Sequence, residues 1–166
     1  MPDATNDWQS TRQADLSIRR YQSSDRPAVS RLHRAGLQQM AADLGAGPWD
    51  ADLDDIEAAY LDGGEFLVGV RGDEVVAMGA LRRVTEATAD VKRLRVREEL
   101  QGRGVGEAIA RALERRAREL RFRRLTADTT AKQVPAQRLL GKLGFHEVAR
   151  KDVRGLEVIY YERELS

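Results

Sequence analysis

The sequence predicts a single α/β domain of the α+β kind, in which helices cover both faces of a mixed sheet. Segments with the two-residue period of strands alternate with segments of helical period along nearly the whole chain. The length of 166 residues suits one domain with its own core. A turn rich in glycine leads into the longest amphipathic segment. The predicted order is β-α-α-β-β-β-α-β-α-β-β.

The first half of the chain supplies six of these elements. Residues 1–14 are polar and are expected to form a flexible tail, so that the domain spans 15–166. A strand at 16–21 precedes a helix that Ser24 or Asp25 can cap, with Pro27 in its first turn. A Gly-Pro segment at 45–48 ends this helix. A second helix and three strands are then predicted at 52–61, 66–70, 74–81 and 88–97.

The third of these strands contains a break in its apolar alternation. Val91 is out of phase with Leu94 and Val96, and one extra residue in the strand would explain the slip. We therefore predict a β-bulge near Lys92.

The second half begins with a long helix at about 104–120, where apolar residues recur at helical spacing. A strand at 123–128 and a helix at 135–143 follow, and Gly144 is suited to end that helix. Two last strands, at 145–151 and 156–164, flank a turn at Arg154 and Gly155.

Composition excludes several classes of protein. There is no cysteine, which excludes disulfides, a cysteine nucleophile and a cysteine-based zinc site. His33 and His146 form no metal-binding motif, so no metal is expected. The 28 basic residues are offset by 27 acidic ones, which argues against a nucleic-acid partner. No apolar run is long enough to span a membrane, and a cytoplasmic location is expected.

The glycines at 102, 104 and 106 lie where a strand ends and the long helix begins. The first turn of a helix leaves about four N–H groups without partners, and these groups attract anions. Glycine lets the backbone approach such an anion closely, so a diphosphate is the expected guest. The Walker and Rossmann patterns are both absent, which disfavours nucleotide triphosphates and dinucleotides.

The string Gln101-Gly102-Arg103-Gly104-Val105-Gly106 resembles the [QR]-x-x-G-x-[GA] acetyl-CoA signature of the GNAT superfamily of N-acetyltransferases. The segment at 136–145, Ala-Gln-Arg-Leu-Leu-Gly-Lys-Leu-Gly-Phe, is similar to a second conserved segment of that family. The resemblance covers about 16–164 and implies a mostly antiparallel sheet of six to seven strands, about four helices, and splayed fourth and fifth strands.

The resemblance also implies a donor site. Acetyl-CoA would be the co-substrate, with its pantetheine along the backbone of Leu94, Arg95 and Val96. Its diphosphate would lie on the glycine turn and the start of the helix. The coenzyme-binding residues implied are Leu94, Arg95, Val96, Gln101, Gly102, Arg103, Gly104, Val105, Gly106, Glu107 and Gln133.

Two catalytic roles follow from the same resemblance. Asp90 stands where the family often carries a glutamate base, with Glu86 a weaker alternative, and the amide of Val96 is the candidate donor to the thioester oxyanion. The tyrosine that usually acts as acid is replaced by Leu140, and Tyr60, Tyr160 or Tyr161 are the substitutes to consider.

The acceptor is expected to be the amine of a small molecule, attacked directly without an acyl-enzyme. The acids Asp43, Asp50, Asp52, Asp54 and Asp55 would favour a cationic amine. Three alternatives stay open: a protein or peptide acceptor, a non-catalytic acyl-CoA-binding module, and a regulator that binds nucleotide phosphates. A homodimer is also possible through unpaired strand edges.

Overall fold

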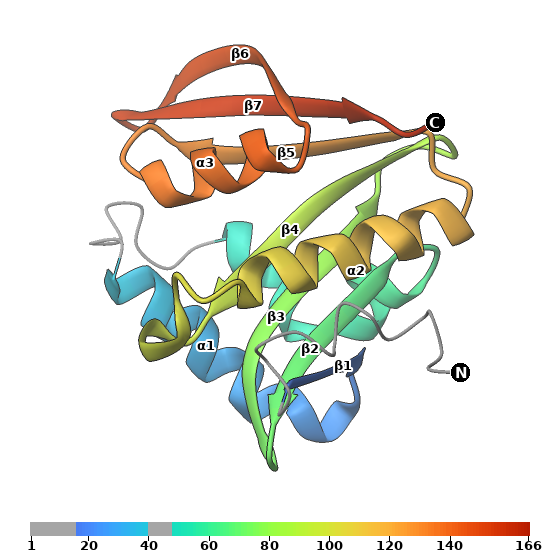
Figure 1. The fold of residues 1–166 in the computed structure, drawn as a ribbon, viewed down its shortest axis with the longest axis vertical. Helices are drawn as coiled ribbons and strands as arrows, with labels where there is room; N and C mark the ends of the chain where they lie inside the picture. Colours follow the sequence, from blue (N-terminus) through green and yellow to red (C-terminus); the bar gives the residue numbers. More distant parts are fainter. Residues whose placement is uncertain (1–15, 40–47) are drawn as a thin grey trace.

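A computed structural model describes residues 16–39 and 48–166, with side chains for 16–36 and 51–166. The predicted flexible tail, 1–14, lies outside the described residues. Figure 1 shows one sheet of seven strands with helices packed against it. The strands are β1 (Leu16–Arg20), β2 (Glu65–Arg71), β3 (Glu74–Arg83), β4 (Thr88–Val96), β5 (Arg124–Thr130), β6 (His146–Val153) and β7 (Leu156–Glu164).

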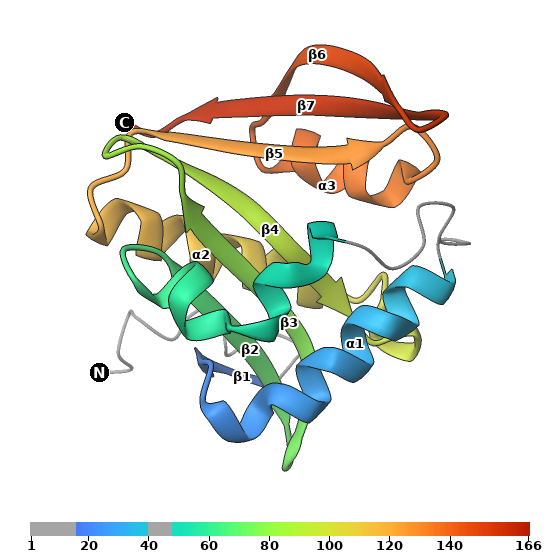
Figure 2. The ribbon, with the colours of Figure 1, turned by 180° about the vertical axis from the view of Figure 1, so that it is seen from behind.

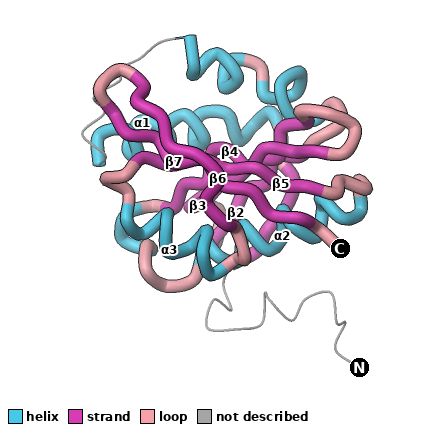
Figure 3. Tube along the Cα trace, turned by 90° about the horizontal axis from the view of Figure 1, so that it is seen from above, coloured by secondary structure: helices cyan, strands magenta, loops and turns pink. Residues whose placement is uncertain are grey.

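The helical segments lie on both faces of this sheet. They are η2 (Ser23–Asp25), α1 (Arg26–Gln39), η3 (Pro48–Asp54), η4 (Glu57–Leu61), η5 (Glu98–Leu100), α2 (Val105–Glu119) and α3 (Val134–Lys142). Figure 2 shows α1, η3 and η4 on one face, and Figure 1 shows α2 and α3 on the other. Seen from above in Figure 3, the strands form the middle layer between the helices. The predicted fold class is confirmed.

The sheet order is β1-β2-β3-β4-β5-β7-β6, and every neighbouring pair is antiparallel except β4 with β5. A tight turn joins β2 to β3, and the turn predicted at Arg154 and Gly155 joins β6 to β7. Gly72 has a φ of 62° between β2 and β3, and Arg154 and Gly155 both have positive φ between β6 and β7. Positive φ is the backbone conformation that two-residue hairpin loops need.

Two apolar cores lie on opposite faces of the sheet because side chains alternate along each strand. The larger core packs α2 against the sheet through Val105, Ile109 and Leu113. The smaller core packs α1 and η4 against the other face through Val29, Tyr60 and Phe66. Each core thus holds the helices of one face in place.

The predicted second helix at 52–61 is not one helix. The chain forms a 3-10 segment, η3, and then a single π turn, η4. Asp55 separates the two because its Oδ1 accepts a hydrogen bond from the Ala58 amide at 3.1 Å. Such a cap starts a new turn instead of continuing the old one.

Gly79 on β3 allows α2 to lie close to the sheet. A Cβ at this position would be 2.6 Å from Ile109 Cγ2 and 2.9 Å from Leu113 Cδ1. We expect Gly79→Ala to lower the free energy of unfolding by about 1–3 kcal/mol through overpacking. Gly141→Ala is the control, because a Cβ there meets nothing within 4 Å. It should raise stability slightly, and urea unfolding of both variants would show opposite signs. A Gly79→Ala variant with the same free energy of unfolding as the wild type would contradict the close packing of α2 on β3.

Candidate active site

Strands β4 and β5 pair only at their first residues and then separate. The parallel ladder joins Thr88, Ala89 and Asp90 to residues 124–126, and beyond that point β4 pairs only with β3. The whole of β5 pairs with β7 along its other edge. Figure 1 shows the two strands together near the C terminus and diverging towards α3. The predicted splay is therefore confirmed.

The separation of β4 and β5 leaves a gap between the two strands. A β-bulge lies on β4 beside this gap. Met78 of β3 faces Arg95, whereas Ala80 faces Lys92, so two steps on β3 correspond to three on β4. Arg93 has a φ of 57°, in the left-handed region. The extra residue explains why Val91 and Leu94 both contact the α2 core although three positions separate them. The bulge predicted near Lys92 is confirmed.

The bulge also decides which backbone groups of β4 face the gap. The Arg97 amide donates to the Val76 carbonyl at 2.8 Å, so this pair is hydrogen-bonded across to β3. Hydrogen-bonded and non-bonded pairs alternate in an antiparallel ladder. The amide and carbonyl of Val96 therefore point away from β3, towards the gap, where Gln101 Nε2 donates to the carbonyl at 3.0 Å.

The glycine turn leads into α2 as the sequence predicts. Gly102 and Gly104 have φ values of 75° and 86°, and Gly104 caps α2 without any side-chain hydrogen bond. The Ala108 amide makes an early bond of the helix, to the Gly104 carbonyl at 3.0 Å. The amides before it are the donors that an α-helix leaves without intrahelical partners. The start of α2 is therefore suited to an anion.

A cavity of about 670 Å³ joins these features. It is bounded by α1 through Gly36, by the separated part of β4, by the glycine turn and by α3. Its lining residues are Gly36, Leu94, Arg95, Val96, Gln101, Gly102, Gly104, Gly106, Glu107, Thr130, Lys132, Gln133, Pro135, Ala136, Leu139, Lys142 and Leu156. The cavity therefore reaches from the α2 face of the sheet to α1 on the other face.

Nine of the eleven residues predicted to bind coenzyme line this cavity. Arg103 is exposed and does not line it, and Val105 is only 1% exposed because it belongs to the α2 core. Gln133 does line the cavity, but its Oε1 also accepts a hydrogen bond from Thr129 Oγ1 at 2.8 Å, which fixes the start of α3.

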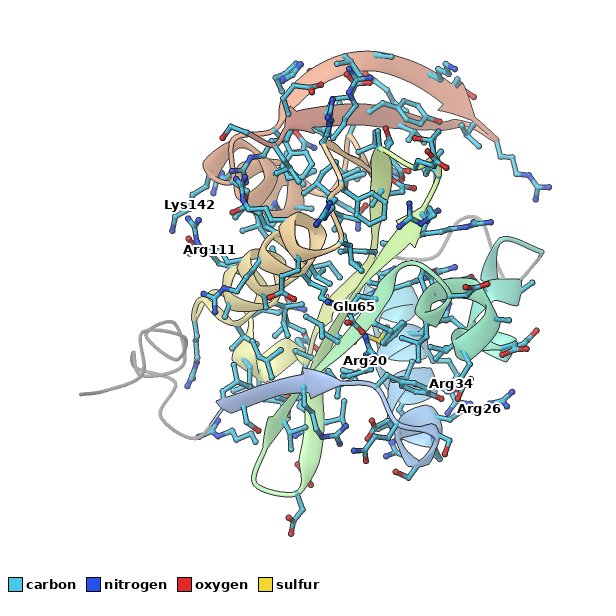
Figure 4. The ribbon with its side chains drawn as sticks, turned by 90° about the vertical axis from the view of Figure 1, so that its right-hand side faces the viewer. Arg20, Arg26, Arg34, Glu65, Arg111 and Lys142 are labelled. Atoms are coloured by element: carbon cyan, nitrogen blue, oxygen red, sulfur yellow. The ribbon has the colours of Figure 1, made fainter. Side chains whose placement is uncertain are left out.

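Charges at the α2 end of the cavity are partly paired. Glu107 Oε2 accepts from Lys142 Nζ at 2.9 Å, and Glu107 Oε1 accepts from Arg111. Figure 4 shows Lys142 and Arg111 beside each other. The hydrogen bond from Lys142, and then that from Arg111, lower the pKa of Glu107. Lys142 lines the cavity whereas Arg111 does not, so one cation, from α3, lies next to the candidate phosphate site.

Asp90 lies at the point where β4 and β5 separate. Thr126 Oγ1 on β5 donates to its Oδ1 at 2.8 Å, and Lys92 Nζ lies 3.6 Å from its Oδ2. Its side chain is 18% exposed. Burial raises the pKa of Asp90, although Thr126 and Lys92 act in the opposite direction. A carboxylate of raised pKa is suited to accept a proton.

Of the acids expected to attract a cationic amine, Asp52 and Asp55 have partners within the protein, and Asp54 is exposed. Asp52 forms an ion pair with Arg93 and accepts a hydrogen bond from the Tyr60 hydroxyl. Asp55 caps η4. Asp43 and Asp50 lie outside the described side chains. Asp52 is thus part of the protein's own packing and carries little attraction for a ligand.

The candidate substitutes for the missing acid have structural contacts. Leu140 is buried in the α2 core, as is Tyr161. Tyr60 is fully buried, and its hydroxyl is directed at Asp52. Tyr160 is half-buried beneath the Lys151 ammonium, 5.5 Å from the ring centroid.

Sequence reasoning missed the partners that lie far away along the chain. Thr126 is 36 residues from Asp90, Asp52 is 41 residues from Arg93, and Lys142 is 35 residues from Glu107. The slip in parity was the signal for the bulge, but no local pattern indicates these partners.

Comparison with known proteins agrees with this architecture. Residues 30–145 match the acetyltransferase (GNAT) family, and the chain belongs to that family of N-acyltransferases. It is 28% identical over 138 residues to the uncharacterized N-acetyltransferase YjgM of Escherichia coli K12, covering 79% of this chain and 82% of YjgM.

Solved structures show the same fold. One is yncA of Salmonella typhimurium with its cofactor acetyl-CoA, at 21% identity and a TM-score of 0.78, covering 92% of this chain and 95% of that one. Another is a ribosomal-protein-alanine N-acetyltransferase of Brucella melitensis, at 22% identity and 0.76, covering 90% and 99%.

In the described part of the chain, no helix is long and apolar enough to cross a bilayer. Residues 16–39 and 48–166 also hold no group of three or more side chains suited to bind a metal ion.

The glycine turn allows a direct test of coenzyme binding. At a φ of 86°, alanine in place of Gly104 costs about 1–2 kcal/mol, so the turn would shift and misplace its amides. We expect Gly104→Ala to weaken coenzyme A binding about tenfold or more. Gly72→Ala is the matched control, because Gly72 also has a positive φ, of 62°, but lies in the β2–β3 turn and does not line the cavity. Calorimetry of both variants tests the turn, and equal affinities would contradict its proposed role.

Proposed function

We propose that this protein transfers an acetyl group from acetyl-CoA to the amine of a small molecule, by direct attack and without an acyl-enzyme. The observation that carries the proposal is the continuous cavity from the start of α2 to the gap between β4 and β5. It joins a helix start suited to a diphosphate to the unpaired edge of β4, where a reacting group could lie. The structure of yncA with acetyl-CoA, which has the same fold, supports this donor.

The roles of the donor site follow from its charges and amides. The amides at the start of α2 would hold the diphosphate, with Lys142 beside it. The pantetheine would lie along the edge of β4 that β5 leaves unpaired. The Val96 amide, which faces the gap, would donate to the thioester oxygen as negative charge develops there.

The reaction needs a neutral amine. For an amine of pKa about 10.4, removing the proton at pH 7 costs roughly 4.6 kcal/mol. We assign this proton to Asp90, directly or through water, because its carboxylate lies where the strands part and has a raised pKa. The amine nitrogen attacks the thioester carbon, the C–S bond breaks, and coenzyme A leaves as the thiolate, which then takes a proton.

A small acceptor is supported by how closely the other face of β4 is covered. An ideal Cβ on Gly36 of α1 would be 2.7 Å from Arg95 Nε, so α1 lies directly against β4. Asp52 of η3 contacts the same strand through Arg93. An acceptor reaching the gap from this side enters between helical segments that are already packed on the strand.

The absence of cysteine simplifies an assay of acetyl transfer. A thiol reagent reports only the coenzyme A released, because the protein contributes no thiol. The assay compares amino acids, polyamines and amino sugars with peptides that carry a free N terminus, and mass spectrometry confirms the acetylated product. Turnover of peptides alone would indicate that the acceptor is a protein and not a small molecule. Tight binding of acetyl-CoA without turnover on any amine would indicate a non-catalytic module, and preference for ATP would refute the donor site.

A further inference from the structure

Asp52, Arg93 and Tyr60 form a buried cluster that joins the helical segments of the α1 face to the bulge of β4. Arg93 Nε donates to Asp52 Oδ2 at 2.9 Å, and a second guanidinium nitrogen donates to Oδ1. The two side chains are 13% and 11% exposed. The Tyr60 hydroxyl donates to the same carboxylate. The cluster thus connects η3, η4 and β4.

The ionisation of the cluster is fixed by these contacts. Burial by itself would raise the pKa of Asp52, but the hydrogen bonds from Arg93 and Tyr60 outweigh it and the pKa is lowered. Burial and the bond to Asp52 raise the pKa of Tyr60. The carboxylate stays charged and the hydroxyl stays protonated at neutral pH, so a bidentate pair and a third donor persist.

The backbone conformation of Arg93 requires such support. A non-glycine residue with a φ of 57° is in an unfavourable region, and it persists only where its surroundings hold it. Arg93 is the extra residue of the bulge, and the next three residues, Leu94, Arg95 and Val96, line the cavity. Holding Arg93 therefore fixes the direction in which the Val96 amide points.

We infer that the Asp52–Arg93–Tyr60 cluster is a positioning device that holds the β4 bulge, so that the backbone of residues 94–96 is aligned to receive the thioester. This inference rests on the proposed role of the Val96 amide. None of the three side chains lines the cavity or acts on substrate. They act on the reaction through the backbone of β4.

Two double variants separate this role from a general effect on folding. Both Asp52→Asn/Arg93→Ala and Asp52→Asn/Arg93→Gly remove the ion pair, but glycine adopts a positive φ without strain. We expect kcat to fall about 100-fold in the alanine variant, as a misplaced reacting group does. The glycine variant should recover about tenfold or more of that loss, because its bulge survives.

Binding of coenzyme A should weaken much less than kcat falls, by about tenfold at most in the alanine variant, because only the contacts of residues 94–96 change and the start of α2 is unaltered. Glu74→Gln is the control: it removes an exposed ion pair to Arg97 at the other end of the β3–β4 hairpin, and it should leave kcat unchanged. Tyr60→Phe removes only the hydroxyl and should give a smaller fall in kcat.

Equal kcat in the two double variants, or wild-type kcat in the alanine variant, would overturn the inference. Amide exchange of residues 91–97, measured with coenzyme A bound, tests whether the cluster holds the β4 backbone. It does so even if the wild type acetylates no amine tested. Protection that is lost in the alanine variant and kept in the glycine variant supports the device, whereas equal protection overturns it. The positioning role of the cluster and the proposed acetyl transfer can thus be refuted independently.

Discussion

Asp90→Asn is expected to lower kcat/KM about 100- to 1,000-fold at neutral pH, which is the usual contribution of a positioned general base. The asparagine keeps the size of the side chain and can still accept from Thr126, but it cannot take the proton of the amine. The thiol-release assay measures the loss. Coenzyme A affinity should stay unchanged, because Asp90 does not line the coenzyme cavity.

The pH dependence gives this prediction a direction. Burial raises the pKa of Asp90, and the base works only when deprotonated. Wild-type kcat/KM should therefore fall as the pH drops through this raised pKa. This fall is the acid limb of the pH profile, and the Asn variant should lack it. Thr126→Val removes a hydrogen bond that lowers the pKa, so its limb should move to higher pH. If Asp90→Asn keeps the acid limb, another group is the base.

Stability supplies an independent check on Asp90. A carboxyl group whose pKa is higher in the folded than in the unfolded state costs stability at pH values above the folded pKa. Asp90→Asn should therefore keep or raise the melting temperature at pH 7 while losing activity. A variant that loses both together would indicate that Asp90 has a structural role.

The second large effect concerns Glu65, which is 3% exposed and paired with two arginines. Arg20 of β1 donates to both of its oxygens at 2.9 Å, and Arg116 of α2 donates to Oε2 at 2.8 Å. Figure 4 shows Arg20 and Glu65 side by side. We expect the Arg20→Met/Arg116→Met variant to lose about 3–5 kcal/mol, because it leaves a buried charge without a cation. The melting temperature should fall by roughly 10 °C.

Two further variants separate charge burial from packing. Adding Glu65→Met should restore most of the stability, since apolar groups of similar volume often replace a buried ion pair at little cost. Glu119→Gln removes only the exposed partner of Arg116, at 56% exposure, and should change stability by about 0.5 kcal/mol or less. A triple variant as unstable as the double would indicate lost packing and not an unpaired charge.

The sequence by itself determined the order of strands and helices, the bulge in β4 and the glycine turn at the start of α2. These features follow from local patterns, because periodicity, capping and glycine conformation depend on residues close together in the chain. The separation of β4 from β5 was implied by family resemblance, and the ladder of three residue pairs confirms it. The roles of Asp90 and Val96 stay predictions.

Only the tertiary structure decided which charged groups pair. Asp52 could have faced solvent and a ligand, but the fold places it against Arg93, and Glu65 finds Arg20 and Arg116 at separations of 45 and 51 residues. In a chain with 28 basic and 27 acidic residues, sequence offers many equivalent partners for each charge. The choice depends on distance and burial in three dimensions, because an ion pair gains its strength where water is excluded.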